Sequence, residues 1–182
     1  MIRTSLKALA LKYNCSFTYE EKTFNLGECI RNVPHNVITL AKVNNSLKLK
    51  ITCEFVYGTS PKPSYYTGNL TDNYIFRIEA EFNDSERFND FYIISNSAIR
   101  FYLFNSSFQV KTKDKELKSY LKQNVILKRI YDESYKSAEI SPMIEVEVKR
   151  NKVYFDINYQ SFEINFEILE DVIRFIEELK QD

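Results

Sequence analysis

The clearest pattern along the chain is an alternation of apolar and polar residues. Every second residue is apolar over 47–57, and the same period returns over 74–82. Strand side chains point alternately to the two faces of a sheet, so this period predicts strands with one buried face. The charged residues at the polar positions are Lys48, Lys50 and Glu54 in the first strand and Arg77, Glu79 and Glu81 in the second. Such opposite charges favour an antiparallel pairing of the two strands.

Further alternating or apolar segments extend the predicted sheet. Residues 143–159 predict a hairpin with its turn near Asn151, a residue type that tolerates the left-handed conformation. Residues 36–43 are predicted to pair with the 47–57 strand through a turn at 44–46. Other predicted strands are a short pair within 15–27 and single strands at 90–95, 107–111 and 125–131. The periodicity does not decide between helix and strand for 97–104.

Helical spacing of apolar residues predicts an N-terminal helix over 2–13 and a C-terminal helix over about 166–180. Asp114 is a predicted N-cap for a mid-chain helix over 115–123. Strands with one polar face favour an antiparallel sheet over a doubly wound parallel one. We therefore expect a single α+β domain over residues 1–182. Its antiparallel sheet has roughly 6–8 strands and is covered on one face by the N-terminal, C-terminal and mid-chain helices.

The composition is that of a globular protein, and it limits the cellular compartments in which we expect the protein. The 182 residues are 44% hydrophobic and 27% charged, with a formal net charge of zero. The first apolar run, 8–11, is too short for a signal peptide, and no segment is long and apolar enough for a transmembrane helix. Three dispersed cysteines favour free thiols in a reducing compartment. We expect a cytoplasmic protein, and the neutral overall charge makes nucleic acid an unlikely partner.

Histidine and glycine are too scarce for most catalytic and cofactor motifs. The chain has one histidine, His35, and three glycines, which excludes glycine-rich nucleotide loops and histidine pairs. With His35, the cysteines Cys15, Cys29 and Cys53 form a Cys₃His set by count. Their spacing does not match that of structural zinc sites, which usually show close ligand pairs. We expect no metal and no cofactor, and His35 is interpreted as a surface loop residue.

Two carboxylate pairs are the alternative source of acid–base chemistry. Glu79 and Glu81 share one strand face, and Glu145 and Glu147 share another. Paired carboxylates are used by hydrolases, but these pairs fall on the polar phase of their strands, where glutamates are usually solvated. We therefore assign no catalytic residue.

Two segments carry the candidate binding residues. Residues 58–73 form a connection much longer than most and contain Lys62, Tyr65 and Tyr66. Residues 111–129 carry a net charge of +5, whereas 160–182 carry −5. Within the basic segment, the predicted helix supplies a second set of candidate binding residues, which could contact phosphates or an acidic partner. This set is Lys115, Lys118, Tyr120 and Lys122.

These features favour a non-enzymatic binding protein whose partner is another protein, for example an accessory or immunity-type inhibitor. One alternative is a small-molecule or lipid carrier with an aromatic-lined cavity under the C-terminal helix. The other is a small enzyme that uses His35 or the paired carboxylates. The sequence does not indicate the oligomeric state.

Overall fold

The computed structural model describes residues 2–24, 33–44, 46–56, 73–83, 89–96, 107–136, 140–161 and 166–181. Its helices are α1 (Ile2–Lys12), α3 (Lys115–Gln123), α4 (Val125–Lys136) and α5 (Phe166–Gln181). Its strands are β1 (Ser16–Phe24), β2 (Val33–Val43), β3 (Lys48–Val56), β4 (Asn73–Phe82), β5 (Phe91–Ser95), β6 (Phe108–Lys111), β7 (Ile140–Lys149) and β8 (Lys152–Ser161).

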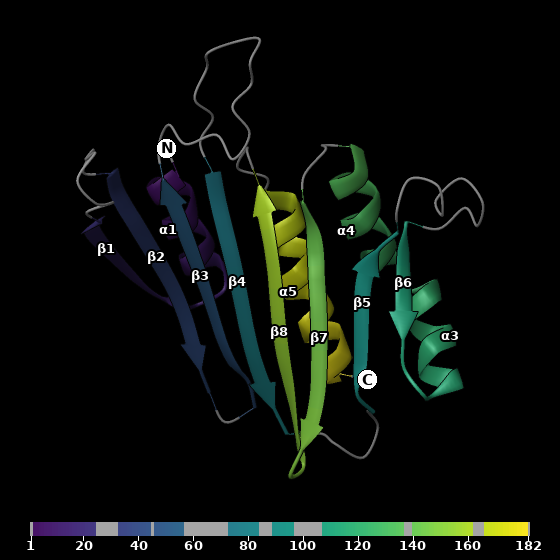
Figure 1. Cartoon of the computed structure of the whole chain (residues 1–182). Coiled ribbons are helices and arrows are strands. Elements are labelled where there is room, and N and C mark those ends of the chain that lie inside the picture. The colour runs from purple at the N-terminus through teal and green to yellow at the C-terminus, as the bar shows by residue number, and fades with distance from the viewer. Residues whose placement is uncertain are drawn as a thin grey trace.

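All eight strands belong to one antiparallel sheet with the order β1-β2-β3-β4-β8-β7-β5-β6. The β7–β8 hairpin is inserted between β4 and β5, so strands distant in sequence lie side by side. The described helices lie on one side of the sheet, with α1 behind β2 and β3 and α5 behind β8 and β7 (Figure 1). This arrangement confirms the predicted α+β fold with an antiparallel sheet covered on one face.

The core lies between the helices and the sheet. In β3 and β8 the buried residues alternate with more exposed ones, as the sequence period predicts. Helix α5 presents its apolar stripe to this core, and Leu169, Val172, Ile173 and Ile176 are fully buried. Burial of this apolar surface is the main force that holds the helices on the sheet.

The predicted pairing of the first two alternating strands is confirmed in register. Lys48 lies opposite Glu81 and Lys50 opposite Glu79. The predicted turn of the second hairpin is also confirmed, because Asn151 has a φ of 63° in the left-handed region.

Two predicted elements are wrong. Residues 125–131 were expected to form a strand but begin α4, because Asn124 Oδ1 accepts a hydrogen bond from the backbone N–H of Leu127 at 2.9 Å and caps this helix. Leu127, Ile130 and Tyr131 then form a buried stripe at helical spacing. Residues 15–27 do not hold a short strand pair, since 16–24 is one strand, β1, that pairs with β2. The segment 97–104, left undecided, lies outside the described residues.

Aromatic side chains on the helix side of the sheet are packed against one another. Phe76 and Tyr159 are buried and stack with their ring centroids 4.7 Å apart. This is core packing, so the hypothesis of an aromatic-lined carrier cavity stays a prediction without a supporting observation. Among the described helices, none has the length and apolar character needed to cross a membrane.

Candidate functional site

The predicted binding residues of the 58–73 connection are Lys62, Tyr65 and Tyr66, and all three lie outside the described residues. Their binding role stays a prediction. The candidate site must therefore be sought on the sheet and on α3.

Helix α3 divides the second predicted group between two surfaces. Lys115 and Lys122 are exposed and Lys118 is half-buried. Tyr120 is two residues away from both Lys118 and Lys122. In a helix with 3.6 residues per turn this is a rotation of about 200°, so Tyr120 lies on the opposite side of α3 from these lysines. The Tyr120 hydroxyl donates to Glu178 Oε1 of α5 at 3.1 Å. Tyr120 is therefore turned toward α5, and binding by the three lysines stays a prediction.

Asp114 fixes the start of α3, as the sequence predicts. Its carboxylate accepts hydrogen bonds from the backbone N–H groups of Glu116 at 2.9 Å and Leu117 at 3.0 Å. The amide of Asn89 donates to the same carboxylate at 2.9 Å. The bond from Leu117, followed by that from Asn89, lowers the pKa of Asp114 because these donors favour the charged form.

The residues of the Cys₃His set are spread over several elements. Cys15 is half-buried after α1, and Cys53 is fully buried within β3. Burial raises the pKa of both thiols. His35 lies in β2, opposite Val56 of β3, and not in a loop as predicted. Cys29 lies outside the described residues, among which no three histidine, cysteine or acidic side chains are placed to hold a metal.

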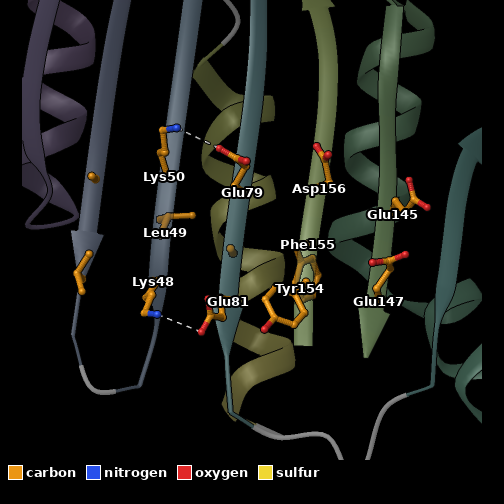
Figure 2. A pocket seen from close by; sticks show the side chains of 13 residues that line it. Lys48, Leu49, Lys50, Glu79, Glu81, Glu145, Glu147, Tyr154, Phe155 and Asp156 are labelled. Carbon is orange, nitrogen blue, oxygen red and sulfur yellow. Dashed lines mark hydrogen bonds and ion pairs between the residues drawn. The ribbon is translucent and has the colours of Figure 1, made fainter. Parts of the chain in front are cut away.

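The helix-free face of the sheet brings the two predicted carboxylate pairs near each other. Glu79 and Glu81 project from β4, and Glu145 and Glu147 from β7, with β8 between these strands. All four stand on the side of the sheet away from the helices (Figure 2). This proximity follows from the strand order, which places β8 beside β4.

Two rows of side chains cross the strands on this face. The first row is Ala41, Lys50, Glu79, Asp156 and Glu145, and the second row is Val43, Lys48, Glu81, Tyr154 and Glu147. Each row runs over β2, β3, β4, β8 and β7 in that order. Four steps between neighbouring strands give a length of about 19 Å, and the rows are about 7 Å apart along the strands.

A hollow of about 560 Å³ lies between these two rows. Its walls are the side chains of both rows, and its floor is formed by the residues between them, Leu49, Ala80 and Phe155. We call this hollow the trough (Figure 2). Its volume lies within the range of about 300–1,000 Å³ that is typical of ligand sites.

Ion pairs hold the side chains of β3 and β4 in place. Lys50 Nζ lies 3.3 Å from Glu79 Oε2, and Lys48 Nζ lies 3.1 Å from Glu81 Oε1 (Figure 2). Lys152 Nζ approaches the same Glu81 oxygen at 2.6 Å. Hydrogen bonds from Lys152 and Lys48 lower the pKa of Glu81, which keeps this carboxylate ionised and unsuited to act as a general acid.

The carboxylates of β8 and β7 are less fully paired. Arg77 Nη2 lies 3.2 Å from Oδ2 of Asp156, Asn158 Nδ2 donates to Oδ1 of Asp156 at 2.8 Å, and Lys149 contacts one oxygen of Glu147. Glu145 is exposed and forms no ion pair within the described part of the chain. The negative charge of the trough is therefore least compensated at its β8–β7 end.

Like charges lie directly opposite each other in the first row. Asp156 of β8 is the register partner of both Glu79 and Glu145. Directly opposed like charges destabilise a sheet, whereas opposite charges stabilise it. Arg77 lies 3.5 Å from Glu79 Oε1 and 3.2 Å from Asp156 Oδ2 and offsets the repulsion between these two, whereas Glu145 has no such cation within the described residues.

The molecule is an α+β protein whose antiparallel sheet is covered by helices on one face and carries the charged trough on the other. No family model matches the chain, and neither the curated proteins nor the solved structures provide a match to it. The function must therefore be inferred from the site itself.

Proposed function

We propose that this chain is a non-enzymatic binding protein whose trough receives lysine or arginine side chains from a partner protein. The observation that carries the proposal is the composition of the trough walls. Five carboxylates and two lysines line the trough, which gives its walls a net charge of −3. These carboxylates are Glu79, Glu81, Asp156, Glu145 and Glu147.

The chemistry of the walls suits cationic side chains. A carboxylate has two oxygens with about four acceptor sites in all. The contacts from Arg77 and Asn158 to Asp156, and from Lys149 to Glu147, therefore leave acceptor capacity on both carboxylates. Tyr154 lies between Glu81 and Glu147 in the second row, where its ring can contact a bound cation. The cations Arg77, Lys149 and Lys152 stand outside the trough walls and leave its centre open.

The floor of the trough favours recognition by inserted side chains over strand addition. β3, β4 and β8 are each hydrogen-bonded to a strand on both sides. Their backbone N–H and C=O groups are already used, so the floor offers no edge to which a partner strand could pair. A partner must therefore reach the trough from above, through long side chains such as those of lysine and arginine.

A protein that covers a basic cluster on its partner acts most simply as an inhibitor or accessory factor. Basic clusters on proteins commonly contact phosphates or other anions. Occupying such a cluster with the carboxylates of the trough blocks its access to anions. The proposed role thus agrees with the accessory or immunity-type function expected from the sequence.

A binding experiment with a defined cationic probe tests this proposal. Fluorescently labelled hexalysine is titrated with the 182-residue protein and anisotropy is measured at 20 mM and 150 mM salt. The variant Glu145→Gln/Glu147→Gln/Asp156→Asn removes three charges from the trough, and Glu20→Gln/Glu21→Gln/Glu116→Gln removes three exposed charges elsewhere. At about 0.2–1 kcal/mol for each exposed pair, the trough variant should bind roughly tenfold more weakly.

The control variant should bind the probe as the unchanged protein does, and hexalysine with acetylated amines should not bind. Equal weakening by both variants would mean that only the overall charge matters. Binding that the trough variant leaves unchanged would place the cation site elsewhere. Either result would falsify the proposal.

A further inference from the structure

Helix α3 carries a second charged surface, on the opposite end of the sheet from β1. Lys115, Lys118 and Lys122 are spaced by three and four residues, so they share one side of the helix. The other side of α3 packs into the fold, where Leu117 and Leu121 are buried. We call the three residues the lysine face of α3.

The positive charge of the lysine face is not compensated by neighbouring acidic groups, in contrast to that of the lysines on the sheet. Lys48, Lys50 and Lys152 on the sheet each lie within 3.3 Å of a glutamate oxygen. Within the described residues, the lysines of this face form no ion pair with an acidic group. Uncompensated charge of one sign is therefore concentrated at this corner of the molecule.

Lys122 stands in the last turn of α3, where the helix dipole favours a cation, but the rest of this concentration of charge does not serve the stability of the helix. Like charges three and four residues apart on a helix are destabilising by about 0.2–0.5 kcal/mol for each pair. Lys115 also stands in the first turn, where the helix dipole disfavours a cation. An external anion is the simplest means of offsetting these repulsions.

We propose that the lysine face of α3 binds the phosphate backbone of nucleic acid without reading its sequence. At 1.5 Å per residue, its lysines follow each other along the helix axis at about 4.5 and 6 Å. This places a row of ammonium groups beside a regular row of phosphates. Lysine binds phosphate as a strongly hydrated point charge and recognises no base by itself.

The observations favour nucleic acid over the two other classes of anionic partner. Protein interfaces usually add an aromatic anchor to their charged contacts, and Tyr120 points away from this face toward Glu178. Recognition of anionic membranes uses clusters of about 4–8 basic residues or an exposed apolar helix face. The apolar face of α3 is buried. The neutral overall charge, which argued against a nucleic-acid partner in the sequence analysis, averages over this local surface.

The experiment measures binding of a labelled 20-base-pair DNA duplex by fluorescence anisotropy between 50 and 200 mM salt. Three phosphate contacts give a slope of about −2.7 in log K against log salt, or about 40-fold weaker binding across this range. The variant Lys115→Gln/Lys118→Gln/Lys122→Gln should bind at least tenfold more weakly at 50 mM and lose most of this slope. Glutamine is a good helix former, so α3 should persist.

The control of equal charge, Lys7→Gln/Lys12→Gln/Lys42→Gln, acts on α1 and β2 at the far end of the sheet, where Lys12 and Lys42 are paired with Glu170 and Glu177. It should bind the duplex as the unchanged protein does. Three results would overturn the proposal. They are no binding at 50 mM salt, equal loss in both variants, and tighter binding to a polyglutamate peptide or to phosphatidylserine vesicles than to DNA. The trough variant should retain duplex binding, which separates this inference from the proposed function.

Discussion

Replacing Asn124 with alanine tests whether one side chain holds three helices together. Asn124 is 7% exposed and lies between α3 and α4. Its Oδ1 accepts from the backbone N–H of Leu127, which caps α4, and its Nδ2 donates to Glu178 Oε1 of α5 at 2.7 Å. Its backbone N–H also donates to the carbonyl oxygen of Tyr120, a bond that alanine retains.

The expected loss of stability follows from the two side-chain bonds. Removal of an N-cap costs about 1 kcal/mol. The bond to the Glu178 carboxylate contributes about 1 kcal/mol, less than the roughly 1.5–3 kcal/mol of bonds to charged groups, because water can replace it at a half-exposed carboxylate. Together these effects give about 2 kcal/mol. For a chain of this size, that corresponds to a decrease in Tm of about 4–8 °C.

Urea denaturation followed by circular dichroism at 222 nm measures this effect in the absence of tryptophan. Asn124→Asp retains the capping oxygen but replaces the donor with a carboxylate beside Glu178, so it separates the two contributions. Gln123→Ala, at the exposed neighbouring position, is the control and should stay within about 0.5 kcal/mol of the unchanged protein. An Asn124→Ala variant as stable as this control would refute the assignment of both bonds.

Two further predictions concern the acidic partners of the helices. Asp114→Asn should keep the cap on α3 at pH 7 and remove a pH dependence of the stability. Because the pKa of Asp114 is lowered in the folded state, its contribution to stability is complete above the unfolded pKa of about 3.9 and is lost as pH falls through the folded value. Acid titration of both proteins, followed by circular dichroism, checks this; identical acid transitions would contradict it. Arg129→Met should destabilise the fold by about 2 kcal/mol, because Arg129 holds the nearly buried Asp171 through both carboxylate oxygens. The loss is smaller than for a fully buried pair, since Arg129 is half exposed and Arg174 also lies 3.7 Å from Asp171. The double variant with Asp171→Asn should recover part of this loss in urea denaturation, and no recovery would show that the charge left behind is not the cause.

Strands with alternating residues were predictable because their pattern is local. The 47–57 and 74–82 segments each show the period of two, and the charges on their polar faces indicate how they pair. The 125–131 segment was mistaken for a strand because a short apolar run fits either structure. Asn124 carried the missing signal, since asparagine before an apolar segment is also an N-cap.

The sequence predicted some of the residues of the trough but not their proximity, which depends on the strand order. The carboxylate pairs of β4 and β7 were recognisable from their spacing of two residues. Their proximity depends on the pairing of β8 with β4, whose partners are 71 to 87 positions apart in the sequence, and no local pattern predicts this strand order. Asp156 and Tyr154 of β8 therefore did not stand out as functional candidates, although they complete both rows.

The trough and the lysine face of α3 differ in how their charges are compensated by neighbouring groups, which favours separate binding roles for them. On the β3–β4 side of the trough, lysines and glutamates neutralise each other, and the excess negative charge gathers toward β8 and β7. On α3, the lysines stand without such partners among the described residues. A fold that needed charge only for solubility would intersperse both signs over its surface. The segregation instead agrees with the two proposals, a site for cations in the trough and a site for anions on α3.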